Sequence, residues 1–215
     1  MEPLKNAFSY PKARLIAEAV KRAHPAFSLP QFSKRLEVAL EPLELEQRMR
    51  LIADRIEAGL PAHPPELFAI LTEALAVDEG DPHGLRGFLV WPLTEIVARR
   101  GLGHFPESMA ALCEMTNRFT GEFAIRPFLR KHRERTLKQL HAWCDHPDEH
   151  VRRLVSEGSG PLVRGAEIYR SCWSRRIRRW GCWKNSTAIR VITCGCRSRI
   201  TSMISANITR SSSSR

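Results

Sequence analysis

Basic side chains accumulate in one part of the chain, and these are the groups that bind phosphate. Residues 99–153 hold 11 Lys and Arg against 7 Asp and Glu, a net charge of +4, whereas residues 1–98 come to −3. A protein that follows a nucleic-acid backbone needs such a surface. The candidate phosphate contacts are Arg126, Arg130, Lys131, Arg133, Arg135, Lys138, Arg152 and Arg153. The alternative for each is an ordinary solvated helix face, and for Arg126 also a buried ion pair.

Two acids of this region lie at expected helix ends. Glu122 follows Thr120 at a helix start, where the helix dipole favours a negative charge, so a structural role would explain it. Glu157 lies near a helix end, just before Gly158, where a negative charge is unfavourable. The unfavourable position of Glu157 indicates a functional role, and the alternative is a solvated surface residue.

The histidines and cysteines predict neither a metal nor a cofactor. His104, His132, His141, His146 and His150 lack metal-ligand spacing. The group Cys172, Cys182, Cys194 and Cys196 departs from the C-x-x-C spacing of zinc knuckles. No Gly-rich phosphate loop and no Ser/His/Asp pattern occurs in the sequence.

The composition changes at about residue 160. Residues 1–159 hold 22 basic and 22 acidic residues, so residues 160–215, with 12 Lys and Arg against the single acid Glu167, carry the whole net charge of +11. That segment also holds ten Ser and four of the six Cys. We therefore divide the chain into a domain at 1–159 and a basic Ser/Arg/Cys-rich tail at 160–215. The tail is expected to be disordered and to bind nucleic acid non-specifically.

The composition of the domain is typical of a soluble protein of the cytoplasm. No run approaches 18 apolar residues, and the N-terminus lacks the apolar core of a signal peptide. Only Cys113 and Cys144 occur in residues 1–159, which fits a reducing compartment. We expect a monomer without a membrane span.

The elements that must position these residues are helices. Apolar residues recur three and four apart, as in Leu67, Ile70, Leu71 and Leu75, and Pro and Gly separate the stretches. The same rhythm is expected to bury Leu15 in one helix and Val38 in another that includes Phe32, Leu36 and Leu40. Later helices are expected at about 89–100, 107–118, 122–129, 134–144 and 148–157. About nine or ten helices without strand alternation predict an all-α fold, with Trp91 and Trp143 in the core rather than stacked on bases.

The last two expected helices, joined by a tight turn at 145–148, have the pattern of a HEAT-like repeat. The segment from Leu102 to Phe105, the segment Arg118-Phe-Thr-Gly-Glu-Phe-Ala-Ile-Arg-Pro-Phe-Leu129, and His150-Val-Arg-Arg-Leu-Val-Ser-Glu-Gly-Ser159 together resemble the AlkC branch of the AlkC/AlkD-type DNA alkylation repair glycosylases. The resemblance covers residues 1 to about 160, more closely from about 85 onward. It implies a HEAT-like helical-repeat solenoid that cradles double-stranded DNA carrying alkylated bases.

The resemblance also implies a reaction, the hydrolysis of the N-glycosidic bond of N3-methylated purines such as 3-methyladenine, without a cofactor. Glu122 and Glu157 match the family's carboxylate positions and are the expected catalytic residues. A methylated purine is already a cation and needs little protonation, so carboxylates help by stabilising the oxocarbenium-like sugar and by positioning water. Aromatic faces would attract the cationic base, which must be extruded or reached by bending the DNA.

After Ser159 the chain departs from the family, which continues with further helices and a further aromatic and Asp of the site. Read with the coding frame shifted by one base, residues 167 to about 209 can encode two such helices, including the family's Ala-Asn-His-Leu-Asn-Asp segment. We therefore expect that the tail is out of frame, that this copy is impaired and that it is marginally stable. Two alternatives stay open: a non-catalytic HEAT-like module that binds DNA or protein, and a functional basic tail that binds nucleic acid.

Overall fold

The structure is a computed structural model that describes residues 3–76 and 84–159. Its α-helices are α1 (Tyr10–Ala23), α2 (Leu29–Ser33), α3 (Leu36–Leu40), α4 (Leu45–Glu57), α5 (Pro64–Glu73), α6 (Trp91–Arg100), α7 (Phe105–Thr116), α8 (Glu122–Lys131), α9 (Arg133–Ala142) and α10 (Glu149–Ser159). Four 3₁₀ helices accompany them: η1 (Leu4–Phe8), η2 (Gly87–Val90), η3 (Gly101–Gly103) and η4 (Trp143–Asp145). No strand occurs in these two ranges, and the all-α prediction is confirmed.

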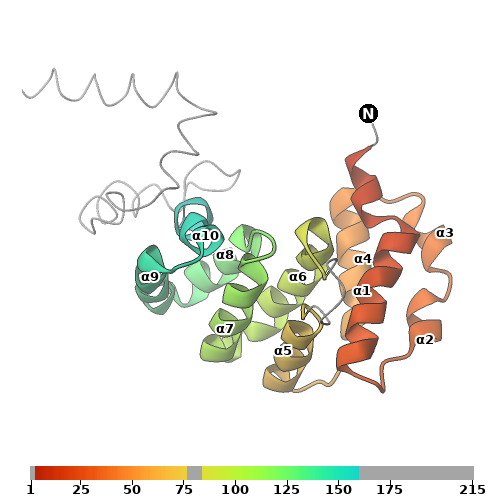
Figure 1. Ribbon diagram of the computed structural model, residues 1–215, viewed down its shortest axis with the longest axis horizontal. Helices are drawn as coiled ribbons and strands as arrows, with labels where there is room; N and C mark the ends of the chain where they lie inside the picture. The colour runs from red at the N-terminus through yellow and green to blue at the C-terminus, as the bar shows by residue number, and fades with distance from the viewer. Residues whose placement is uncertain (1–2, 77–83, 160–215) are drawn as a thin grey trace, which may run out of the picture.

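The helices stack side by side in two layers, with α1, α2 and α3 at one end and α9 and α10 at the other (Figure 1). In one layer α4 packs on α6, α6 on α8, and α8 on α10. In the other layer α1 packs on α5, and α5 on α7. Each helix contacts mainly its neighbours in the stack, as expected for a helical-repeat solenoid. The predicted HEAT-like architecture is confirmed.

Proline sets the beginning of several of these helices. Helices α1, α5, α6 and α7 each carry Pro in the first turn, where the missing N–H costs no hydrogen bond. Helix α4 instead begins with a capping box between Glu44 and Gln47. Pro127 is different because it lies inside α8 and has no N–H to offer the carbonyl of Phe123. The first turn of α8 therefore lacks one of its regular hydrogen bonds.

A single hydrophobic core runs between the layers along the stack. Phe8, Ile16, Ile52 and Phe128 are fully buried at successive places in it. Trp143 is buried as predicted, whereas Trp91 is only half-buried and packs against the edge of the core.

Two predictions from apolar spacing are wrong. Residues 29–40 form two short helices rather than one, because Arg35 adopts a left-handed backbone with φ of 55° between α2 and α3. Leu15 is 53% exposed and Val38 is 67% exposed, so the spacing placed both side chains on the wrong face. In α1 the buried side is formed by small residues such as Ala13 and Ala17 together with Ile16.

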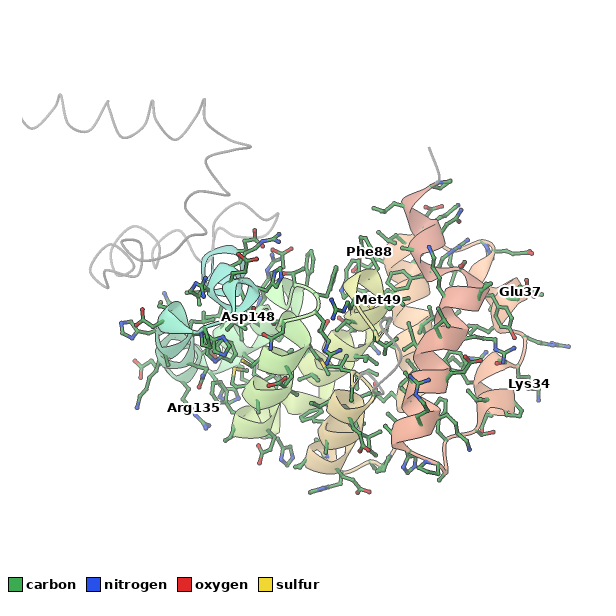
Figure 2. The ribbon with its side chains drawn as sticks, in the orientation of Figure 1. Lys34, Glu37, Met49, Phe88, Arg135 and Asp148 are labelled. Carbon is green, nitrogen blue, oxygen red and sulfur yellow. The ribbon has the colours of Figure 1, made fainter. Side chains whose placement is uncertain are left out.

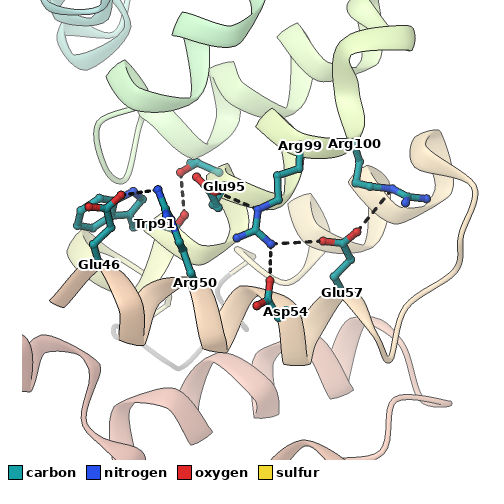
Figure 3. A network of polar contacts seen from close by, with 9 residues as sticks. Glu46, Arg50, Asp54, Glu57, Trp91, Glu95, Arg99 and Arg100 are labelled. Carbon is teal, nitrogen blue, oxygen red and sulfur yellow. Dashed lines mark hydrogen bonds and ion pairs between the residues drawn. The ribbon is translucent and has the colours of Figure 1, made fainter. Parts of the chain in front are cut away.

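Charged side chains connect α4 to α6 (Figure 3). Arg99 on α6 binds Asp54 on α4 and approaches Glu57 Oε2 at 3.9 Å. Its Nε–H also donates to Glu95 Oε1 of its own helix at 2.9 Å. Arg100 Nε lies 3.6 Å from Glu57 Oε1. The network joins two consecutive helices of one layer at its surface.

The predictions made for residues 160–215, namely disorder, the shifted reading frame and the rejected zinc group, lie outside the described residues. Across 3–76 and 84–159, no helix is long and apolar enough to pass through a bilayer.

Candidate functional site

The end of α10 crosses the beginning of α8 at very short range, and Gly158 permits this, while Gly121 permits the close approach of α7 to the start of α8. A Cβ on Gly158 would lie 2.7 Å from Ile125 Cγ2 and 3.9 Å from the Cα of Glu122. A Cβ on Gly121 would lie 2.7 Å from Thr116 Oγ1. Since real Cβ atoms do not approach other atoms at 2.7 Å, larger residues would push the helices apart. The crossing brings the helix ends that carry Glu122 and Glu157 together.

Glu122 is the first residue of α8, and its side chain is half-buried. Its backbone N–H donates to Thr120 Oγ1 at 3.3 Å. Burial raises the pKa of the Glu122 carboxyl, and the negative charge of Glu157 raises it further, while Arg126 and Arg153 lower it. Glu122 is therefore a carboxyl whose charge the two arginines compensate only in part.

Glu157 has a direct partner. Arg153, one turn earlier on α10, donates from Nε to Glu157 Oε1 at 2.7 Å. This ion pair offsets the unfavourable position of an acid near a helix C-terminus. The two carboxylates thus differ, because Glu157 is paired within its own helix and Glu122 faces both arginines at longer range.

A cluster of aromatic rings begins at the residue that follows Glu122. Phe123, the residue after Glu122, is 41% exposed, and its ring stacks on Trp91 with centroids 5.4 Å apart and planes at 21°. The Arg126 guanidinium lies 4.8 Å from the centre of the Phe123 ring. Phe119 contacts both Phe88 and Trp91. The Phe123 ring thus already has a cation, the Arg126 guanidinium, over its face, and part of the ring stays exposed one residue after Glu122.

The predicted phosphate contacts are divided between different surfaces. Arg126 and Arg153 act on Glu122 and belong to the site. Arg152 donates from Nη1 to the backbone carbonyls of His146 and Pro147, which stabilises the turn before α10. The Arg135 guanidinium lies 4.4 Å from the centre of the Phe105 ring. In Figure 2 Arg135 lies at the lower edge of the helices, whereas Phe88, which contacts Phe119 near the carboxylates, lies at the upper edge. The remaining predicted contacts, all exposed, are Arg130, Lys131, Arg133 and Lys138.

The sequence reasoning missed Phe123 and Phe119. A signal was present, because both residues flank Glu122 within the segment Phe119-Thr-Gly-Glu-Phe123. The reasoning also expected Trp91 in the core, whereas Trp91 supports the exposed Phe123 ring.

The chemistry available here is electrostatic. Two carboxylates can stabilise a developing positive charge and orient water. Within residues 3–76 and 84–159, no three His, Cys, Asp or Glu side chains gather as metal ligands.

Two known proteins are similar to this chain. The uncharacterized protein YhaZ of Bacillus subtilis (strain 168) is 36% identical over 166 residues, which cover 76% of this chain and 44% of that protein. The structure of Pseudomonas fluorescens alkylpurine DNA glycosylase AlkC bound to DNA containing an abasic site analog matches with a TM-score of 0.68 and 34% identity, again over 76% of this chain and 44% of the other. No protein-family model matches the chain. The chain spans less than half the length of both relatives.

Proposed function

Because the resemblance to the AlkC branch of the DNA alkylation repair glycosylases is confirmed over 76% of this chain, we propose that the site described above serves DNA base excision. The proposed reaction is the hydrolysis of the N-glycosidic bond of N3-methylated purines in double-stranded DNA. The observation that carries the proposal is the close crossing of α8 and α10 at Gly158, which brings the helix ends that carry the two carboxylates together. The exposed Phe123 side chain follows Glu122 at the same helix end.

In this proposal Glu122 faces the sugar as it becomes oxocarbenium-like and stabilises the positive charge. Its incomplete compensation suits this role, because a carboxylate already neutralised by an ion pair would have less charge to offer. Glu157, held by Arg153, orients the attacking water. The exposed Phe123 side chain packs against the methylated base, which leaves as a neutral molecule and needs no acid.

Base release from methylated duplex DNA tests this function. Glu122→Gln and Glu157→Gln are each expected to lower the release of 3-methyladenine by about a hundredfold to a thousandfold, because each removes a charge that stabilises the transition state. Glu134→Gln on the exposed surface of α9 is the matched control and is expected to leave the rate unchanged. Measurable base release by the unaltered chain, with equal rates in all three variants, would exclude a catalytic role for the pair.

The alternative is a non-catalytic HEAT-like module that binds DNA or protein. It is favoured by the fact that the chain spans only 44% of the length of the DNA glycosylase it matches. Stoichiometric binding to methylated or abasic DNA without release of free base would support the module, whereas repeated turnover would support the enzyme.

We further propose that residues 160–215 are a segment translated out of frame, following a HEAT-like DNA alkylation repair domain at 1–159, and that this copy is impaired as a result. The nucleotide sequence across codons 150 to 215 tests this division. Codons that spell the family's Ala-Asn-His-Leu-Asn-Asp segment in the next frame support it, and codons incompatible with that overlap exclude it.

A further inference from the structure

A cavity of about 230 Å³ lies beside the carboxylate pair, and its walls carry groups that bind anions. It is lined by Arg118, Phe119, Thr120, His150 and Arg153. Three of these residues come from the connection between α7 and α8, and two come from the first half of α10. At about 30 Å³ per molecule, water alone would fill it with roughly eight molecules. The cavity can therefore hold an anion the size of phosphate with some of its hydration.

Arg118 is one of the two guanidinium groups that line this cavity. Its guanidinium is half-buried, and among the described residues it makes no hydrogen bond and no ion pair. Burial lowers the pKa of Arg118, and the nearby charge of Arg86 lowers it further, with Glu114 acting in the opposite direction. A cation in this position is stabilised best by a bound anion.

Arg86 is held near Arg118 by the backbone. The N–H of Gly87 donates to the carbonyl of Arg118 at 3.0 Å, and Gly87 takes a left-handed conformation with φ of 60° to make this turn. This bond keeps the two segments together, and the charge of Arg86 acts on the Arg118 guanidinium. Guanidinium groups that lie near one another are suited to bind phosphate.

The remaining walls supply neutral donors and a link to the carboxylates. Thr120 Oγ1 accepts the N–H of Glu122, so its hydroxyl proton can point to another acceptor. The His150 ring can donate a further N–H. Arg153 lines the cavity and binds Glu157 as well, so an anion in the cavity would lie next to the proposed catalytic residues.

We propose that this cavity, with Arg118 in its wall, binds one phosphate group of the DNA backbone beside the Glu122 and Glu157 pair. The choice of DNA as the source of the phosphate rests on the proposed function. The residues Arg118, Arg86 and His150 are not among the phosphate contacts predicted from the sequence. A phosphate held here would fix the position of the sugar relative to the carboxylates. A cationic base is a poor occupant, because the walls are themselves positive.

The test is binding of the full chain to an unmodified DNA duplex, measured by fluorescence anisotropy across a series of salt concentrations. Arg118→Met is expected to weaken binding by about threefold to tenfold and to reduce the slope of log affinity against log salt by about 0.9, the value for one phosphate contact. Arg118→Lys should keep the slope, since it keeps the charge. Lys12→Met, which removes an exposed charge on α1, is the matched control and should change neither quantity.

A second measurement identifies the source of the phosphate. The Arg118 Nε–H resonance is followed by NMR in the full chain while DNA duplex or inorganic phosphate is added. The proposal requires a shift with duplex DNA at concentrations where inorganic phosphate has no effect. A shift with inorganic phosphate alone, or an unchanged salt slope in Arg118→Met, would overturn the DNA-backbone assignment. If the chain releases no base but Arg118→Met still weakens DNA binding and reduces the salt slope as expected, the proposed glycosylase function is wrong and the phosphate site stands.

Discussion

The carboxyl of Glu122 is half-buried at the beginning of α8, and the cause that raises its pKa most is burial, followed by the charge of Glu157. A raised pKa means that the folded chain holds a proton at a pH where the unfolded chain has lost it. Between the unfolded value and the higher folded value, lowering the pH therefore stabilises the fold. Raising the pH through the same window removes that stabilisation. The catalytic rate is expected to change with pH in the opposite direction. Lowering the pH through the same window protonates Glu122 and lowers the rate, because the proposed role needs the ionised carboxylate.

The first prediction concerns this pair. Glu157→Gln is expected to lower the pKa of Glu122 toward its ordinary range, because one of the two causes of the shift disappears. Carbon-13 NMR of the glutamate carboxyls during a pH titration measures the change, with Glu134→Gln as control. An unchanged Glu122 pKa would mean that burial acts alone and that the two carboxylates do not interact.

At the scale of the helices, the site depends on the close crossing of α8 and α10. Gly158→Ala places a methyl group 2.7 Å from Ile125 Cγ2 and 3.2 Å from Leu154 Cδ1. Overpacking costs about 1–3 kcal/mol, and the better helix propensity of Ala returns up to about 1 kcal/mol.

The second prediction is therefore that Gly158→Ala lowers the free energy of unfolding by about 1–2 kcal/mol. Urea unfolding measures it. Gly103→Ala is the matched control, because nothing lies within 4 Å of a Cβ there, and its effect should stay within about 0.5 kcal/mol. Equal effects of the two substitutions would contradict the close approach of the helices.

The network between α4 and α6 supports a third prediction. Arg99→Met leaves Asp54, Glu57 and Glu95 near one another without their shared cation, and it should destabilise the fold by about 1–2 kcal/mol. Arg50→Met is the control, because among the residues that the structure describes Arg50 pairs only with Glu46 one turn away on the exposed face of α4, an interaction of about 0.2–0.5 kcal/mol. Urea unfolding at low and high salt compares them. A loss no larger for Arg99→Met than for Arg50→Met would show that the network adds nothing to isolated pairs.

Helix positions could be predicted from the sequence because their causes are local. Apolar spacing, with Pro and Gly between the stretches, placed α6 to α10 within about two residues. The exposure of Leu15 and the break at Arg35 could not be predicted, since both depend on which neighbours a helix packs against. The pairing of Glu122 with Glu157 was expected from the family resemblance alone. Its physical cause, the contact of Gly158 with α8, is tertiary and leaves no local pattern.

At the scale of the whole molecule, charge is distributed very unevenly. Residues 1–159 are neutral in sum, and residues 160–215 carry the entire net charge of +11. Two sources of DNA affinity are therefore possible in one chain. The basic residues around the carboxylates form one, and they are positioned by the fold. The twelve cations of residues 160–215 form the other, and they need no particular geometry to attract phosphate.

The fourth prediction separates these sources by deletion of residues 160–215. Because many non-specific phosphate contacts disappear, the salt dependence of binding to unmodified duplex should become much shallower. If the helical domain is the DNA-binding part, it should still bind an abasic duplex at moderate salt, and the preference for abasic over unmodified duplex should increase, since non-specific binding raises both affinities equally. Fluorescence anisotropy with the two duplexes measures the ratio, and circular dichroism verifies that the shortened chain is folded. A folded domain that no longer binds either duplex would assign the DNA affinity to residues 160–215 and would leave the carboxylate pair without a substrate.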